Sequence, residues 1–345
     1  MAGVTPGVFA VVPAGLDDPA RPSGGNTYDR RVLDALVERG WQVCERPVPG
    51  SWPRPGRHDL AALGRVVGAL PDAAVVLVDG LVASAAAGLL VADSGRLRLA
   101  VLVHLPLGTD GERNVLRHSR CVIATSRWSR DWLVRRHDLE PARVTVAEPG
   151  SEPAPAVAGS PGGTRLLTVG VIASHKGQDL LVDALARLAD LDWSCVVVGA
   201  LDVEPDFAGR VRGAAAWSDR IRFLGPRAGA DLAAAYADAD LLVLPSRAEA
   251  FGMVIGEAMA RGIPVVAADV GGVPEALGRD RSGARPGLLV PAGDAGALAG
   301  GLRVWLTDPD LRDRLRRAAL GRRDALPGWS VTTDRISRAL LGVAR

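Results

Sequence analysis

The chain has 345 residues, 48% of them hydrophobic and 23% charged, and its 41 Lys and Arg residues against 39 Asp and Glu residues give a net charge of +2. This composition is typical of globular domains and excludes a disordered, collagen-like or coiled-coil protein. Because there is no basic excess to meet a nucleic-acid backbone, we expect no nucleic-acid partner.

The first half of the chain alternates short β-branched runs with longer helical patterns, which is typical of a parallel sheet with crossover helices. Strands are predicted at Gly7–Val12, Trp41–Arg46, Ala74–Val78, Leu99–Val103, Cys121–Ala124 and Arg143–Val146. Helices are predicted at Tyr28–Arg39, Asp59–Leu70, Leu81–Ala92 and Trp128–Arg136. The first apolar run has no basic region before it and a Pro/Gly-rich loop after it, so it predicts a strand rather than a signal peptide.

Residues 149–164 are rich in Pro, Gly, Ala and Ser and predict an interdomain linker. A second alternation follows, with strands at Arg165–Val169, Cys195–Val198, Ile221–Leu224, Leu241–Leu244, Val265–Ala268 and Leu288–Val290 and helices at Asp179–Ala189, Asp231–Ala237, Gly252–Arg261 and Ala295–Leu306. The tail, residues 311–345, predicts two helical pieces separated at Leu326-Pro327-Gly328. The whole pattern is that of an α/β protein with two Rossmann-like, doubly wound domains.

Open α/β sheets bind ligands at the carboxyl ends of their strands, so the loops there are the first place to look for chemistry. Directly after the strand Leu241–Leu244, the segment PSRAEAFGMVIGEA places Glu249 in the loop and Glu257 in the next helix. Glu140 and Glu148 have the same separation, but Pro141 and a strand pattern interrupt them. Free backbone amides at Gly252, Met253 and Val254 would favour an anion, and a glycine lets a phosphate approach closely.

Lys176 is the single lysine of the chain, and every other basic side chain is an arginine. It lies in the segment TVGVIASHKGQD, which predicts a strand end, a loop containing Gly170 and a helix start. A compact ammonium group can reach between diphosphate oxygens where the wide guanidinium fork cannot. The alternative interpretation is an ordinary surface lysine.

The EAFGMVIGE element resembles the Glu-x7-Glu mark of the family 4 retaining glycosyltransferases, which have the GT-B fold of two Rossmann-like domains facing across a cleft. The resemblance implies that Glu249 contacts hydroxyls of the donor sugar and that Glu257 holds the ribose of the nucleotide. The remaining nucleotide-sugar contacts that it implies come from Gly24, Gly25, Gly170, Lys176, Arg247, Phe251, Gly252, Met253 and Val254. The family commonly has an Arg directly after the loop glycine, where this chain has Val171.

Three further segments fit the same resemblance. Gly24-Gly25, opening the first helix, resembles the glycine pair that borders the donor diphosphate, although a plain turn explains it equally well. His104 follows the strand Leu99–Val103 and corresponds to a histidine near the donor sugar; the alternative is a capping histidine. Gly271-Gly272-Val273-Pro274-Glu275 resembles a loop at the cleft, where Glu275 either caps a helix or touches the donor.

The resemblance implies a retaining hexosyltransferase that uses a nucleoside diphosphate sugar, with His104, Lys176 and Glu249 as the catalytic residues. We expect no cofactor and no metal ion, because Lys176 and helix dipoles take over the neutralisation of the diphosphate. The alternatives are a nucleotide-sugar-binding partner subunit without activity, which the Val171 departure favours, and a nucleotide-sugar epimerase or hydrolase of the same fold.

The resemblance implies that an N-terminal domain of residues 1–148 binds the acceptor and that residues 165–325 bind the donor. The acceptor would be a small molecule, a glycan or a lipid-linked sugar. Residues 326–345 are expected to form a helix that crosses back to the first domain. Arginines crowd residues 113–136, where they would meet an anionic acceptor or a membrane surface, or simply form a solvated face. Cys44, Cys121 and Cys195 are far apart and predict buried thiols in a cytoplasmic protein, at most peripheral on the inner membrane.

Overall fold

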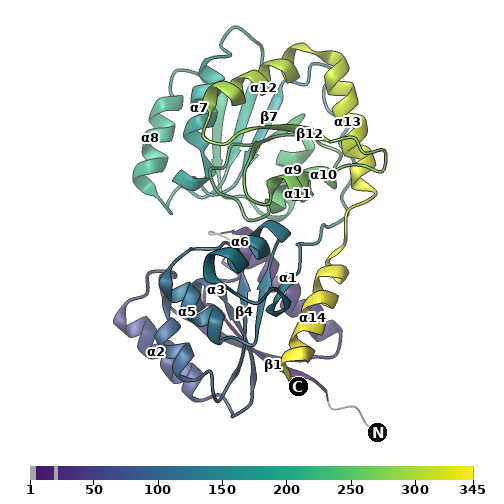
Figure 1. The fold of residues 1–345 in the computed structure, drawn as a ribbon. Helices are drawn as coiled ribbons and strands as arrows, with labels where there is room; N and C mark the ends of the chain where they lie inside the picture. Colours follow the sequence, from purple (N-terminus) through teal and green to yellow (C-terminus); the bar gives the residue numbers. More distant parts are fainter. Residues whose placement is uncertain (1–4, 19–21, 345) are drawn as a thin grey trace. The chain divides into compact units, whose positions relative to one another are not determined.

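The computed structural model describes residues 5–18 and 22–344. The chain divides into two compact units (Figure 1). Unit 1 comprises Met1–Asp17, Gly25–Pro149 and Trp329–Arg345, and unit 2 comprises Asp18–Gly24 and Gly150–Gly328. Each unit has its own sheet and its own hydrophobic core.

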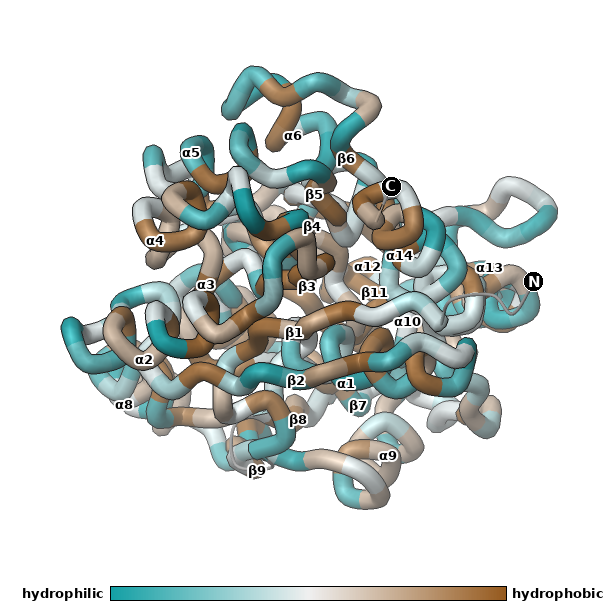
Figure 2. The backbone as a smooth tube through the Cα atoms, turned by 90° about the horizontal axis from the view of Figure 1, so that it is seen from below, coloured by the Kyte–Doolittle hydropathy of each residue, from teal (hydrophilic) through white to brown (hydrophobic). Residues whose placement is uncertain are grey.

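Unit 1 is built on a six-stranded parallel sheet in the order β2-β1-β3-β4-β5-β6. Its strands are β1 (Gly7–Pro13), β2 (Gln42–Val48), β3 (Val75–Asp79), β4 (Arg98–Val103), β5 (Cys121–Ala124) and β6 (Val144–Val146). Its helices are α1 (Gly24–Glu38), α2 (Arg57–Gly68), α3 (Gly80–Ala85), α4 (Ala87–Ala92), α5 (Asp110–His118), α6 (Arg127–His137) and α14 (Trp329–Ala344). In Figure 2 strands β1 and β3 are hydrophobic along most of their length, as expected for strands covered on both faces.

Unit 2 repeats the plan with the parallel order β12-β11-β10-β7-β8-β9. Its strands are β7 (Arg165–Val169), β8 (Ser194–Val198), β9 (Ile221–Gly225), β10 (Leu241–Leu244), β11 (Val265–Asp269) and β12 (Gly287–Pro291). Its helices are α7 (Gln178–Ala186), α8 (Pro205–Ala215), α9 (Gly229–Ala237), α10 (Met253–Met259), α11 (Val273–Leu277), α12 (Ala295–Thr307) and α13 (Pro309–Arg323). The two sheets confirm the α/β class with two doubly wound units, and all twelve predicted strands are present.

The core of unit 2 explains why its strands are continuous apolar runs. Leu241 and Val243 of β10 belong to the cluster formed with α7, α8 and α12, whereas Leu242 and Leu244 belong to the cluster formed with α9, α10 and α11. Alternate residues of a strand point to opposite faces, so a strand with helices on both faces needs apolar side chains at every position.

Besides α11, for which no range was predicted, three helices differ from the prediction. The helix predicted at Leu81–Ala92 is two short helices, because the backbone at Ala86 leaves the helical region with φ −114° and ψ 27°. Helices α5 and α8 were not predicted. In α5 the buried face is only Glu112, Val115 and Leu116, which is too short for a visible apolar period.

The burial of two side chains in unit 1 differs from what their sequence surroundings favour. Cys44 is partly exposed, whereas Cys121 and Cys195 are buried as expected. His137, which lies in an arginine-rich stretch of the sequence, is completely buried. Among the described residues, no helix is both long and apolar enough to span a bilayer.

Candidate functional site

In unit 2 the site is built where β7 and β10 end, because these strands are parallel neighbours in the sheet. The loop after β7 carries a short 3-10 helix, Ser174–Lys176, and Gly177 follows it with φ +71°. A Cβ on Gly177 would lie 2.2 Å from the carbonyl oxygen of Pro245, so only glycine lets this loop touch the loop after β10. The amide of Arg247 then donates to the His175 carbonyl at 2.7 Å.

This contact between the loops brings the single lysine to the first glutamate of the Glu-x7-Glu element. Lys176 Nζ donates to Glu249 Oε2 at 2.7 Å, and Ser246 Oγ donates to the same oxygen at 3.3 Å. Both side chains of the ion pair are largely buried. A cation and a carboxylate are therefore held together at the carboxyl edge of the sheet, where open α/β sheets bind their ligands.

Two glycines of a third loop, which follows β11, contact the backbone of Glu249. A Cβ on Gly271 would lie 1.7 Å from the carbonyl oxygen of Glu249, and the amide of Gly272 donates to that oxygen at 3.1 Å. Gly271 also has φ +58°, which side chains rarely adopt. The loop that was predicted at the cleft thus sets the backbone position of Glu249. Glu275 lies one turn on, in the first turn of α11.

Glu257 lies on α10 and is held by a residue that the sequence analysis missed. The hydroxyl of Tyr236, the last buried residue of α9, donates to Glu257 Oε2 at 2.7 Å. The Arg261 guanidinium stacks over the Tyr236 ring at 4.6 Å. Burial raises the pKa of Glu257, while the hydrogen bond from Tyr236 and the charge of Arg261 act in the opposite direction. The carboxylate is therefore oriented before any ligand arrives.

The other predicted contacts of unit 2 lie around the same loops. Gly252 has φ +92° and precedes α10, which begins at Met253 rather than at Gly252, and Phe251 and Val254 flank this turn. The backbone of Gly170 lies so close to Gly199 that a Cβ on Gly199 would be 1.9 Å from the Gly170 carbonyl oxygen. The amides at the start of α10 have no acceptor within the helix, which makes them the local candidates for donating to an anion.

Arg247, one of the nucleotide-sugar contacts that the resemblance implies, pairs with an acidic side chain in this structure. Its guanidinium makes two hydrogen bonds of 2.7 Å to the carboxylate of Asp179 on α7. Burial raises the pKa of Asp179, but the hydrogen bonds and charge of Arg247 outweigh it, so the pKa of Asp179 lies below its ordinary value. The side chain of Val171 brings no charge, and its carbonyl accepts a hydrogen bond from Gln178.

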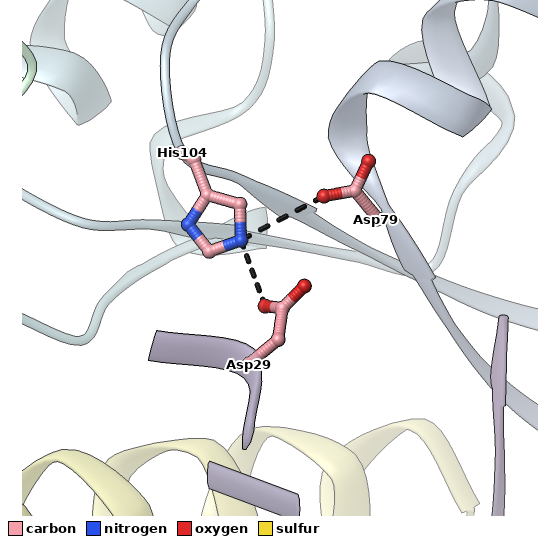
Figure 3. A group of neighbouring side chains, drawn as sticks. All are labelled: Asp29, Asp79 and His104. Carbon is pink, nitrogen blue, oxygen red and sulfur yellow. Dashed lines mark hydrogen bonds and ion pairs between the residues drawn. The ribbon is translucent and has the colours of Figure 1, made fainter. Parts of the chain in front are cut away.

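In unit 1 the predicted His104 meets two carboxylates (Figure 3). His104 Nε2 lies 2.7 Å from Asp29 Oδ1 and 3.7 Å from Asp79 Oδ2. Asp79 ends β3 and Asp29 lies on α1, and both are buried. Among the residues that the structure describes, these three side chains are the one His/Cys/Asp/Glu group whose donor atoms, all within 4.8 Å, could surround a metal ion. In this structure a hydrogen bond already joins the two nearest atoms.

The predicted glycine pair lies at the start of α1, and Gly25 contacts His104. A Cβ on Gly25 would lie 3.4 Å from the imidazole, so the helix approaches the ring closely. Tyr28 meets the ring edge to face at a centroid distance of 5.2 Å. Gly25, Tyr28 and Asp29 are spaced as i, i+3 and i+4 and share one face of the helix. That shared face was not predicted, although Asp79 could have been found by the strand-end argument that found His104.

The loop after His104 is fixed by a second buried pair. Glu112 accepts hydrogen bonds from the amides of Leu107 and Gly108, and its Oε2 lies 2.8 Å from Nε2 of the buried His137. An arginine-rich stretch favours the surface, but the buried carboxylate of Glu112 needs a partner, and His137 supplies it.

The arginines of residues 113–136 lie on α5, on α6 and in the connection between them. Arg113, Arg117, Arg127 and Arg130 pair with acidic neighbours, while Arg120, Arg135 and Arg136 are exposed. The structure therefore places them on a mixed, partly neutralised surface of unit 1.

Residues 152–322 match the family model described as Glycosyl transferases group 1, which is about half of the chain. Two curated relatives are named D-inositol 3-phosphate glycosyltransferase. The one from Frankia alni is 34% identical over 250 residues, covering 66% of this chain and 60% of the relative. The one from Kineococcus radiotolerans is 35% identical over 254 residues, covering 65% of this chain and 57% of the relative.

The chain belongs to the group 1 glycosyl transferases. This group 1 member spans less than two thirds of the length of those curated relatives. Its fold is that of solved GT-B proteins. A sucrose-phosphate synthase from Thermosynechococcus elongatus has a TM-score of 0.78 at 22% identity, covering 97% of this chain and 98% of that one. Anabaena HepE in complex with UDP-glucose has a TM-score of 0.74 at 18% identity, covering 97% and 99%.

Proposed function

We propose that the chain is a retaining, metal-independent glycosyltransferase that moves a hexose from a nucleoside diphosphate sugar to an acceptor hydroxyl. The observation that carries the proposal is the 2.7 Å contact between Lys176 and Glu249 at the carboxyl edge of the second sheet. Glu257 follows on the next helix with its carboxylate already oriented by Tyr236. The names of the curated relatives support a phosphorylated cyclitol as one acceptor to test.

In this proposal Lys176 and the free amides at Gly252 stabilise the charge that grows on the leaving diphosphate. Glu249 binds hydroxyls of the sugar, and Glu257 binds those of the ribose. Because Lys176 is paired with Glu249 when no donor is bound, its ammonium must exchange part of that contact for phosphate oxygens. Arg247 must leave Asp179 before it can serve as a second cation.

The bond between the anomeric carbon and the phosphate oxygen breaks while the acceptor oxygen forms its bond on the same face of the sugar. The acceptor proton passes to the departing phosphate, so no protein nucleophile is needed. Glu249 orients the sugar and does not attack it. Because the acceptor bonds to the face of the sugar that the phosphate leaves, the configuration at the anomeric carbon is retained.

The experiment is a thermal-shift screen of the chain with UDP, GDP, ADP, TDP and their sugars, with and without EDTA, followed by a turnover assay with inositol 3-phosphate. A ligand that binds only the folded state raises its stability. We expect one nucleotide series to raise the melting temperature whether or not EDTA is present. Transfer of the sugar with the configuration of the donor retained would complete the assignment.

The variant Lys176→Gln should lose most of the turnover while its melting temperature without ligand changes little. The matched control is Arg187→Gln, which removes an exposed positive charge directly after α7 and should leave turnover unchanged. Equal turnover in Lys176→Gln and the parent chain would refute the diphosphate assignment. Nucleotide binding without turnover in the parent would favour the partner-subunit alternative, and donor consumption without acceptor would favour an epimerase or hydrolase.

A further inference from the structure

His104 and the two carboxylates beside its imidazole come from three separate elements of unit 1. Asp29 comes from α1, Asp79 from the end of β3 and His104 from the end of β4. Strands β3 and β4 are parallel neighbours, so their ends meet at one edge of the sheet. Figure 3 shows both carboxylates on the Nε2 side of the ring, with the other ring nitrogen, Nδ1, pointing away from them.

Contacts other than those with the imidazole also restrict the two carboxylates. Asp79 Oδ1 accepts hydrogen bonds from the amides of Leu81 and Val82 at 2.8 and 3.1 Å, which leaves its Oδ2 to face Nε2. Asp29 is only 4% exposed and lies on the same helix face as Tyr28 and Gly25, which contact the imidazole.

The backbone of His104 is fixed as well, because its carbonyl accepts a hydrogen bond from Thr125 Oγ1 at 3.2 Å. Nδ1 is then the one polar atom of the ring without a partner among residues 5–18 and 22–344, and it is not one of the buried unpaired atoms. The side chain keeps 17% of its surface exposed. The ring therefore offers a single free hydrogen-bonding position.

The surrounding charges favour the doubly protonated ring. Burial lowers the pKa of His104, but Asp29 and Asp79 more than offset it, and the pKa lies at about 8. Burial and the charge of Asp29 raise the pKa of Asp79 to about 6, against the opposing effects of His104 and the helix amides. Tyr28, the other titratable group facing the ring, has a pKa well above its ordinary value because it is buried, so it stays neutral.

We propose that Asp29 and Asp79 are positioning residues that hold His104 through Nε2 in its charged form and leave Nδ1–H as a donor to an oxygen of a bound substrate. The proposal rests on the proposed function for the identity of that oxygen. It assigns His104 the task of a cationic donor, and it excludes His104 as a general base at neutral pH, because a base must be free of its proton.

The first test needs no activity. NMR titration of histidine-labelled protein, with His104→Gln to assign the signal among the five histidines, should give a pKa of about 8 for His104. Asp29→Asn should lower that pKa by at least one unit, and Asp79→Asn should lower it less. Asp34→Asn is the matched control, because Asp34 lies on the same helix, is 59% exposed and has no contact with the ring.

If Asp29→Asn does not fold, Asp79→Asn decides the question, since asparagine also caps helices well. A parent His104 that titrates near 6.5, or a pKa unchanged in the variants, would overturn the proposal. So would saturable Zn²⁺ binding that removes the imidazolium signal at micromolar metal, because the three side chains would then serve as metal ligands.

The second test is the pH profile of kcat/KM for sugar transfer. Activity of the parent should fall above pH 8, and in Asp29→Asn the fall should begin at least one pH unit lower, with kcat/KM reduced about threefold at pH 6 and more than tenfold at pH 8. A uniform reduction at every pH would mean a merely structural role and would contradict the proposal. If the parent transfers no sugar, the proposed function fails, and the NMR titration still decides whether the two aspartates hold the charged ring.

Discussion

At the scale of single residues, the roles of Lys176, Glu249 and Glu257 stay predictions that rest on residue chemistry and on the resemblance of the Glu-x7-Glu element. A lone lysine among arginines, placed at a strand end, predicted a site for a compact cation. What the sequence could not show is which side chains hold these groups. Tyr236 and Glu257 are 21 residues apart in the sequence, and Asp29 and His104 are 75 residues apart. No periodic pattern in the sequence links residues at such separations.

The hydrogen bond from Tyr236 to Glu257 gives the first prediction. Tyr236→Phe should weaken binding of the nucleoside diphosphate about tenfold, which corresponds to about 1.4 kcal/mol. The carboxylate loses the donor that orients it. The pKa of Glu257, already raised by burial, rises further without that donor, so the loss of affinity should be larger at pH 6 than at pH 8. Isothermal titration with the diphosphate selected by the thermal-shift screen measures both effects.

Tyr28→Phe is the matched control, because Tyr28 is the other tyrosine of the chain and is equally buried. Its hydroxyl donates to the Ala147 carbonyl within unit 1. The control should leave nucleotide affinity unchanged. Equal affinities in Tyr236→Phe and the parent at both pH values would show that Glu257 does not depend on this hydrogen bond for its role.

At the scale of elements, the site of unit 2 depends on three strand-end loops that touch through their backbones. The loops after β7, β10 and β11 approach each other at Gly177 and Gly271, where a Cβ would collide with a carbonyl oxygen. Helices and strands were predictable because their periodicity is local. The contact between loops was not, since a glycine in a sequence shows only that a close approach is allowed and does not name its partner.

Gly271→Ala should displace Glu249 and reduce transfer more than tenfold. Alanine would have to adopt φ +58°, which costs roughly 1–2 kcal/mol, and its Cβ would overlap the Glu249 carbonyl oxygen. Turnover and the melting temperature should be measured together. Both should fall.

Gly293→Ala separates the two causes, because Gly293 has φ +78° and nothing within 4 Å of an added Cβ. This control should lose a similar amount of stability from its backbone strain and keep full turnover. If both variants lose the same stability and neither loses turnover, the loop after β11 does not position Glu249.

At the scale of the whole molecule, the chain leaves unit 1 after Pro149 and returns to it at Trp329. The returning helix α14 packs on β3, β4, β5 and β6, with Ile336 and Leu340 completely buried. Thr332 Oγ1 donates to the Glu148 carbonyl at 2.6 Å and Arg335 pairs with the Glu148 carboxylate at 2.7 Å. Unit 1 is therefore complete only when both ends of the chain have folded.

Leu340→Ala should destabilise unit 1 selectively. Removing a buried leucine costs about 3 kcal/mol, which lowers the melting temperature of a domain of this size by roughly 10 °C. Calorimetry with and without the nucleoside diphosphate should show the ligand raising one transition, that of unit 2, and the substitution lowering the other. The neighbouring Leu341 is 41% exposed, so Leu341→Ala should change stability by less than about 0.5 kcal/mol. A single transition that shifts equally with ligand and with Leu340→Ala would contradict two independent units.

The sequence by itself determined the class of fold, the twelve strands, the positions of His104, Lys176 and Glu249 after strand ends and the position of Glu257 on the following helix. It could do so because apolar periodicity, turn residues and the residue after a strand are local properties. Only the tertiary structure decided that Lys176 contacts Glu249, that Arg247 is held by Asp179 and that His137 is buried against Glu112. These pairings arise when strands that are distant in the chain become neighbours in a sheet, and the free energy of a buried charge depends on the partner that it meets there.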